Sequence, residues 1–216
     1  MGSGARGHMA GRDRKEIVLV GARGQAKDLI GYLEEDGGYR ILCLLDELAV
    51  PKVMGYDVVA PDAYDLGCRD ALLAIGMPQD KRAVLGMYSR FGFRWQGFID
   101  RRAAVSPHAR LGQGCIVAPF AVAAGDVELR DHVYLACFAG AGHDSVVGDF
   151  CSLLPYSGLG GAATLGPGTV LGAGARVMQG IAIGADVSVA AGATVMSDLP
   201  DGVLAHGTPA RTVRRS

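Results

Sequence analysis

The first hundred residues alternate short apolar runs with stretches of helical periodicity. Nearly continuous apolar runs cover residues 16–20, 41–45 and 71–75, and each gives way to Gly or Asp. Apolar side chains at helical spacing over residues 29–33 predict one helix, and a second is predicted from about residue 80 to 90. Strands that are apolar throughout, rather than alternating, favour a parallel sheet covered on both faces.

From Val105 onward, apolar residues recur every six positions, a spacing that is neither that of a helix nor that of a strand. Every sixth residue from 105 to 195 is aliphatic, without one insertion. These positions are Val105, Leu111, Val117, Ala123, Leu129, Leu135, Ala141, Val147, Leu153, Leu159, Leu165, Leu171, Val177, Ile183, Val189 and Val195. The residue four places further on is never bulkier than Ile, and Gly directly follows the aliphatic position seven times.

This period predicts a β-solenoid, because neither a helix nor a simple strand can maintain it. Each hexad is one short strand and a corner, with the aliphatic side chain inside and the small residue allowing the backbone to turn. Three hexads make one triangular coil, which gives about five coils. We therefore expect a small α/β Rossmann-like domain over residues 14–100, with a further strand near residues 94–99, and a solenoid over residues 101–216.

Composition and charge exclude several classes of protein. The net charge is −1, from 21 Lys and Arg against 22 Asp and Glu, so the chain lacks the basic field that binds nucleic acid. No apolar run approaches the 18 to 20 or so residues of a membrane span. The five cysteines include no Cys-x-x-Cys pair, which favours reduced thiols and a cytoplasmic location. Residues 1–13 lack a pattern and are interpreted as a cloning remnant or disordered.

Two groups of residues carry a resemblance to a known family. The hexads and the segment Gly207-Thr-Pro-Ala-Arg211 resemble the hexapeptide-repeat acyltransferases, whose coils form a left-handed parallel β-helix. The segments at residues 21–27, 46–47 and 74–76, in that order before the solenoid, resemble the N-terminal domain of bacterial N-acetyltransferases of nucleotide-linked amino sugars. The resemblance implies acetyl-CoA as co-substrate and an active site between the subunits of a homotrimer.

His143 is the expected catalytic base. It lies two places after the interior position Ala141, so its side chain should project from the coil. An imidazole near neutral pH suits removal of a proton from an attacking amine, and Asp144 would fix its tautomer. The segment resembles the His-Glu/Asp segment of the family. The alternative is a surface His–Asp pair without a function.

The other histidines predict no metal site. His108 and His132 both lie three places after an interior residue but 24 residues apart, so they belong to different faces. Three imidazoles on one edge, as a zinc site needs, cannot come from this spacing. Two roles stay open: a contact of His132 with a neighbouring subunit, and a contact of His206 at the end where CoA binds.

The candidate nucleotide-sugar site follows three strands. Gly21, Ala22, Arg23 and Gly24 lie between a strand and a helix, where backbone N–H groups can bind a phosphate. Asp46, followed by Glu47, can accept hydrogen bonds from a ribose or a base, and Gly76 ends a third strand at the same edge. The alternative is an ordinary strand–helix turn. Gln25 stands where the family often has His.

The acetyl-CoA site is implied by the resemblance, with Ser152, Ala173 and Ala191 counted without gaps from His143, and Pro209 and Arg211 from the C-terminal segment. It comprises Ser152, Gly161, Ala173, Ala191, Gly192, Pro209 and Arg211. Ser152 departs from a His found in some relatives. Small residues let the backbone approach pantetheine closely, although they suit simple corners of the solenoid nearly as well.

We therefore expect an N-acetyltransferase that moves the acetyl group of acetyl-CoA directly to the 4-amino group of a GDP-, UDP- or dTDP-linked 4-amino-4,6-dideoxy sugar. No acyl-enzyme nucleophile adjoins His143. The alternatives are O-acetylation of a sugar hydroxyl and a non-catalytic trimer that binds nucleotide sugar. A solenoid carbonic anhydrase is disfavoured by the histidine spacing.

Overall fold

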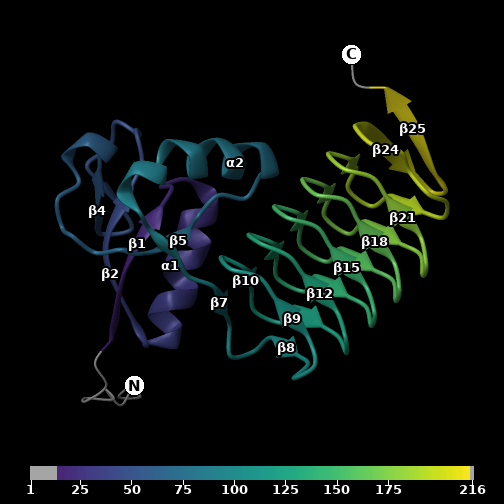
Figure 1. Ribbon diagram of the computed structural model, residues 1–216, viewed down its shortest axis with the longest axis horizontal. Helices are drawn as coiled ribbons and strands as arrows, with labels where there is room; N and C mark the ends of the chain where they lie inside the picture. The colour runs from purple at the N-terminus through teal and green to yellow at the C-terminus, as the bar shows by residue number, and fades with distance from the viewer. Residues whose placement is uncertain (1–13, 215–216) are drawn as a thin grey trace, which may run out of the picture.

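The N-terminal part of the chain is a six-stranded sheet with a helix on each face (Figure 1). The computed structural model describes residues 14–214. The sheet has the order β3-β4-β2-β1-β5-β6, and all its pairs are parallel except β3 with β4. Its elements are β1 (Lys15–Val20), α1 (Gly24–Asp36), β2 (Tyr39–Leu45), β3 (Lys52–Val53), β4 (Tyr56–Val59), β5 (Asp70–Leu73), α2 (Pro78–Met87) and β6 (Arg94–Trp95), with 3-10 turns at Pro61–Ala63 and Ser89–Phe91.

Both faces of this sheet are covered, as the apolar runs predict. Ile17 and Leu19 of β1 pack with α1, whereas Val18 and Val20 point to the other face and pack with Tyr88, next to the end of α2. Strands with two buried faces need apolar residues throughout, which explains why their pattern does not alternate.

The strand expected near residues 94–99 is in fact two strands in different sheets. β6 ends the N-terminal sheet, whereas β7 (Phe98–Ile99) pairs with the solenoid strand β10. The solenoid therefore begins three residues earlier than expected. The predicted cloning remnant at residues 1–13 lies outside the described residues.

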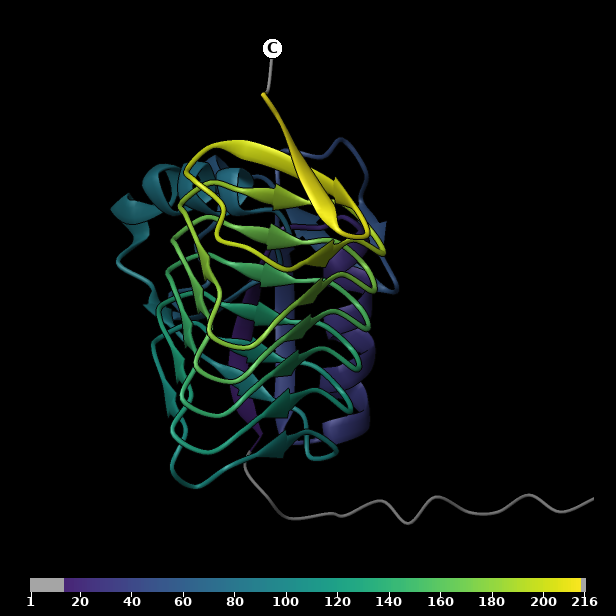
Figure 2. The same ribbon diagram turned by 90° about the vertical axis from the view of Figure 1, so that its right-hand side faces the viewer.

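Residues 98–214 form a solenoid of three sheets, whose strands are parallel except for the C-terminal strand β25, which is antiparallel to β24 (Figure 2). Successive coils are offset by eighteen residues, as in the pairing of Ile116 with Tyr134 and of Tyr134 with Ser152. The first face contains β7, β10 (Ile116–Val117), β13 (Tyr134–Leu135), β16 (Ser152–Leu153), β19 (Val170–Leu171), β22 (Ser188–Val189), β24 (Val203–Gly207) and β25 (Ala210–Arg214). The second face contains β8 (Ala104–Val105), β11 (Val122–Ala123), β14 (Gly140–Ala141), β17 (Gly158–Leu159), β20 (Arg176–Val177) and β23 (Thr194–Val195). The third face contains β9 (Arg110–Leu111), β12 (Glu128–Leu129), β15 (Val146–Val147), β18 (Thr164–Leu165) and β21 (Ala182–Ile183).

The aliphatic column fills the interior, as predicted, but the small column does not make the turns. Val117, Leu135 and Leu153 are fully buried. The small residues, such as Ala121 and Ala139, are buried too and fill the corners. The left-handed backbone lies one residue earlier, with φ between 54° and 65° at nine non-glycine residues of the coil. Small size is therefore required by the narrow corner rather than by the turn.

The N-terminal part packs on the first face of the solenoid. Phe98, Ile116 and Tyr134 point outward from this face and join the apolar cluster of α1, which includes Leu29 and Ile30. This contact covers the first face at the coils of β7, β10 and β13. The corner between the second and third faces lies on the opposite side of the solenoid. No helix within residues 14–214 has the length and apolarity needed to cross a bilayer.

Candidate functional site

His143 projects from the corner between β14 and β15. Its Nδ1 atom lies 2.7 Å from Oδ2 of Asp144, and the two side chains are 63% and 62% exposed. Asp144 occupies the left-handed turn position, with φ of 58°, a conformation that Asp and Asn adopt more readily than other residues. A ring that donates from Nδ1 to a carboxylate presents the lone pair of Nε2 to solvent, which is the state of a general base.

Gly161 lies one coil further along the same corner and supports the imidazole. A Cβ atom at residue 161 would come 2.5 Å from Nε2 of His143, so only glycine leaves room for this ring position. The Gly161 N–H donates no hydrogen bond to any residue of the described range 14–214. The corner therefore combines a free imidazole nitrogen with an unpaired amide donor.

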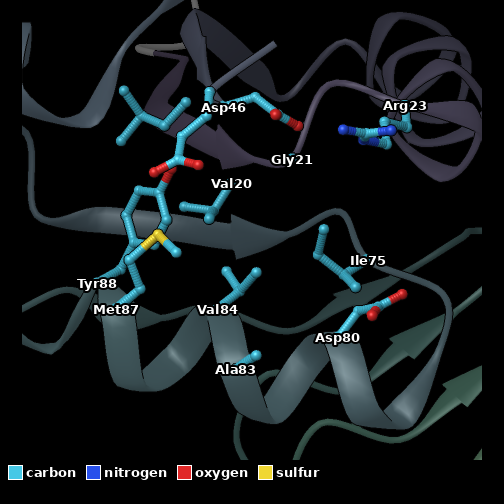
Figure 3. A pocket seen from close by; sticks show the side chains of 12 residues that line it. Val20, Gly21, Arg23, Asp46, Ile75, Asp80, Ala83, Val84, Met87 and Tyr88 are labelled. Atoms are coloured by element: carbon cyan, nitrogen blue, oxygen red, sulfur yellow. The ribbon is translucent and has the colours of Figure 1, made fainter.

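A cavity of about 400 Å³ opens at the carboxyl ends of the N-terminal strands, between β1, β2 and α2 (Figure 3). Gly21, Arg23, Asp46 and Glu47 line it, so the structure brings together four of the residues that the sequence predicts for nucleotide binding. The opposite wall comes from α2, which the sequence analysis did not include in the site. Its lining residues are Asp80, Ala83, Val84 and Met87, spaced by three and four as on one helix face.

Asp46 binds the loops around the cavity rather than leaving its carboxylate free. Oδ2 accepts the N–H of Ala22 at 2.8 Å, and Oδ1 accepts the N–H of Leu48 at 3.0 Å. The Ala22 amide and the Asp46 carboxylate, expected to face a phosphate and a ribose, thus bind each other in this structure, and their contacts with a nucleotide stay a prediction. The two groups satisfy each other because both lie at the ends of neighbouring strands β1 and β2.

Two further features shape the cavity. At Gly21, φ is 111° and a Cβ atom would lie 2.8 Å from the carbonyl oxygen of Ala74, so this position requires glycine. Tyr88 forms the floor beside Val20. Burial, together with the nearby Asp46 and Glu47 carboxylates, raises the pKa of Tyr88 to about 12, so its hydroxyl keeps its proton.

Gly24 and Gly76 do not line this cavity. Gly24 is the first residue of α1 and lies in a shallower neighbouring depression with Ala22 and Arg23. A Cβ atom at Gly76 would meet Oε1 of Gln25 at 2.8 Å, and the Gly76 carbonyl points to the solenoid. The prediction that Gly76 converges on the same ligand is therefore not supported by its position.

Ser152 is buried where the two parts of the chain meet. Its Oγ donates to the Gly76 carbonyl at 2.6 Å and accepts from Nζ of Lys81 at 2.8 Å. Because the Ser152 side chain is fully buried, it cannot make the expected contact with acetyl-CoA. The first face of the solenoid, to which Ser152 belongs, is covered by the N-terminal part at this coil.

His132 is also buried, so its ring is not available for the expected contact with a neighbouring subunit. Its ring stacks on Phe150 at 5.6 Å between centroids and meets Trp95 edge-on. Among residues 14–214, no three His, Cys, Asp or Glu side chains converge in a metal-binding arrangement.

The remaining residues implied for acetyl-CoA are exposed but lie away from His143 in one chain. Ala173, Ala191 and Gly192 belong to the corner between the first and second faces, where Gly192 N–H donates to the Ala173 carbonyl. Pro209 and Arg211 belong to the C-terminal hairpin of β24 and β25 (Figure 2). In the ladder of this hairpin, Arg211 lies opposite the exposed His206. Within one chain only Gly161 of this group lies beside His143.

Comparisons with known proteins agree with this architecture. No family model and no curated protein matches the sequence. Among solved structures, the chain is similar to PerB from Caulobacter crescentus in complex with CoA and GDP-perosamine, with 34% identity and a TM-score of 0.86 over 94% of this chain and 100% of that chain. A histidine variant of perosamine N-acetyltransferase from the same organism, with the same ligands, gives 32% and 0.88 over 95% and 100%. The acetyltransferase domain of PglB from Neisseria gonorrhoeae, in complex with acetyl coenzyme A, gives 28% and 0.86 over 93% and 100%.

Proposed function

Since the chain belongs to the hexapeptide-repeat N-acetyltransferases of nucleotide-linked amino sugars, we propose that it acetylates the 4-amino group of a GDP-linked 4-amino-4,6-dideoxy sugar, with His143 as the base. Acetyl-CoA is the acetyl donor of this family. The choice of guanosine is supported by PerB, which was crystallised with GDP-perosamine and is 34% identical. The observation that carries the role of His143 is its exposed ring, held by Asp144 above Gly161.

The chemistry requires one base and one oxyanion donor. The sugar amine attacks the thioester carbon, and Nε2 of His143 removes a proton from the nitrogen as the C–N bond forms. The negative charge that develops on the thioester oxygen needs a hydrogen-bond donor, and we assign this role to the unpaired N–H of Gly161 beside His143. Collapse of the tetrahedral intermediate breaks the C–S bond, and the imidazolium returns its proton to the CoA thiolate.

The N-terminal part is proposed as a Rossmann-like domain that holds the nucleotide in the cavity between β1, β2 and α2. Arg23 lies at the entrance with an exposed guanidinium that can pair with the diphosphate. Glu47 supplies a carboxylate to the same cavity. A carboxylate can accept hydrogen bonds from the ribose hydroxyls or from the N–H groups of guanine.

A homotrimer would bring His143 of one subunit close to the nucleotide cavity of a neighbouring subunit. His143 lies at the corner opposite the first face, on which the N-terminal part of the same chain packs. The amine is therefore proposed to come from a nucleotide sugar bound by a neighbouring subunit. CoA would lie between adjacent left-handed solenoids, along Ala173, Ala191, Gly192, Pro209 and Arg211.

Exposed aromatic side chains support such an assembly. Phe120, Phe138 and Tyr156 form a continuous stack on the corner between the first and second faces, with ring centroids 5.0 and 4.9 Å apart. Each of the three is about half exposed in the single chain. An exposed apolar strip on a solenoid that cannot close on itself favours a cyclic homo-oligomer.

A substrate panel tests the proposal. GDP-, UDP- and dTDP-linked 4-amino sugars, each with its matched 4-hydroxy sugar, are incubated with acetyl-CoA while CoA release is followed by a thiol reagent. We expect turnover of the GDP-linked amino sugar, an amide in the product by mass spectrometry, and a trimeric mass by light scattering. Acetylation of only the hydroxy sugars would favour O-acetylation instead, and binding of nucleotide sugar without CoA release would favour a non-catalytic role.

A further inference from the structure

Lys81 of α2 is inserted into the wall of the solenoid. Its side chain is 2% exposed, although lysine is rarely buried in proteins. Nζ shares its hydrogens among four oxygens within hydrogen-bond distance, which are the carbonyl oxygens of His132 at 3.0 Å, Phe150 at 3.2 Å and Cys151 at 3.3 Å, and Oγ of Ser152 at 2.8 Å. All four acceptors belong to the solenoid, so this single side chain joins the two parts of the molecule.

Two neighbouring contacts attach the same end of α2. Ser152 Oγ donates to the carbonyl of Gly76, in the loop between β5 and α2, at 2.6 Å. Arg82 donates from Nη1 to Oδ1 of Asp186 at 2.7 Å, and its guanidinium lies 5.4 Å from the ring centroid of Phe150. The Arg82 pair is largely exposed and therefore contributes little, whereas the Lys81 contacts are shielded from water.

The helix that Lys81 attaches is also a wall of the nucleotide cavity. Asp80 directly precedes Lys81 and lines the cavity, as do Val84 and Met87 in the next two turns (Figure 3). A rotation or shift of α2 would therefore change the width of the cavity between Val84 and Asp46. His143 lies on the other side of the coil, away from this wall in the same chain.

We infer that Lys81 is a positioning residue, which holds α2 against the solenoid and thereby sets the affinity of the cavity for the nucleotide part of the substrate. The identity of that ligand rests on the proposed function, whereas the attachment of α2 does not. Replacement of Lys81 by Met keeps an unbranched side chain that is one atom shorter and removes every donor hydrogen. The four oxygens then lose this donor in a buried interface, which weakens the attachment of α2 to the solenoid.

Hydrogen–deuterium exchange tests the attachment directly and needs no substrate. The Lys81→Met protein is compared with an Arg40→Met control, which breaks an exposed pair with Glu16 away from the cavity. In the folded Lys81→Met protein, the α2 amides should exchange on the order of tenfold faster, with the third face of the solenoid unchanged. Unchanged protection of α2 would overturn the inference.

Binding and kinetics test the consequence for the substrate. For Lys81→Met, the Kd for GDP by calorimetry and the KM for the nucleotide sugar should rise about tenfold, with kcat and the KM for acetyl-CoA within about twofold. A lower Tm with unchanged GDP affinity would mean a merely structural role and would overturn the inference. If Lys81→Met does not fold, Ser152→Ala removes one acceptor and should change the same quantities in the same direction by a smaller factor. If the wild-type protein turns over no nucleotide sugar, the proposed function fails, and the exchange of α2 still decides the role of Lys81.

Discussion

The Cα atom of Gly161 lies directly against the imidazole of His143, so close that a Cβ atom would come 2.5 Å from Nε2. Gly161→Ala should therefore displace the ring and lower kcat about 100-fold with little change in Tm, because the backbone at residue 161 is not left-handed. The control is Gly125→Ala, at the same corner one coil before His143, where a Cβ atom meets nothing within 4 Å. Equal activity of the two variants would contradict the supporting role of Gly161.

Removal of the base should affect chemistry and not binding. His143→Asn should lower kcat by about 10²- to 10⁴-fold while the Tm and the affinity for GDP are retained. The measurement is CoA release at saturating acetyl-CoA. His108→Asn is the matched control, since His108 occupies the same corner at the first coil and is exposed. Near-normal turnover by the His143 variant would remove it from the mechanism.

Asp144 has a catalytic and a conformational role that two substitutions can separate. Asp144→Asn keeps a residue that tolerates the φ of 58° and should lower kcat by at least about tenfold, since the amide does not stabilise the imidazolium and can hold the ring in the wrong tautomer. Asp144→Ala should in addition lower the free energy of unfolding by about 1 kcal/mol, because alanine disfavours the left-handed conformation. Calorimetry and CoA release distinguish the two effects. Equal Tm values for both variants would argue against conformational strain at this corner.

The affinity of the cavity for the nucleotide should depend on the hydrogen bonds that Asp46 accepts from the surrounding loops. Asp46→Ala leaves the N–H groups of Ala22 and Leu48 without their acceptor and should raise the Kd for GDP about tenfold. Titration calorimetry measures the change. Asp57→Ala removes an exposed carboxylate paired with Lys52 and serves as the control. An unchanged Kd for the Asp46 variant would show that these loops do not contact the nucleotide.

The buried amine of Lys81 should make stability depend on pH. Burial lowers the pKa of Lys81 to about 7 in the folded protein, whereas an unfolded lysine titrates near about 10.4. Between these values the unfolded chain binds one more proton, so the free energy of unfolding rises with pH, by up to about 1.4 kcal/mol per unit. Urea titrations of wild type and Lys81→Met between about pH 7 and pH 9 should differ in slope by this amount. Equal slopes would mean that Lys81 stays protonated in the fold.

Much of the fold could be predicted from the sequence because its determinants are local and repeated. The interior column of Val117, Leu135 and Leu153 follows from the six-residue period alone, since each coil repeats the same strand and corner. The exposure of His143 follows in the same way from its distance to Ala141. The cavity residues Gly21, Arg23, Asp46 and Glu47 come together because parallel strands end at one edge of a sheet.

The packing of the two parts against each other was decided only by the tertiary structure. Nothing in the period distinguishes Ser152 from an exposed strand residue, yet the N-terminal part buries it beneath Gly76 and Lys81, over seventy positions away in the chain. The same packing buries His132 and makes α2 a wall of the cavity. A repeat specifies which side chains point outward, because that depends on near neighbours. It does not specify which outward side chains meet another part of the molecule, because that depends on the shapes of two surfaces formed by distant segments.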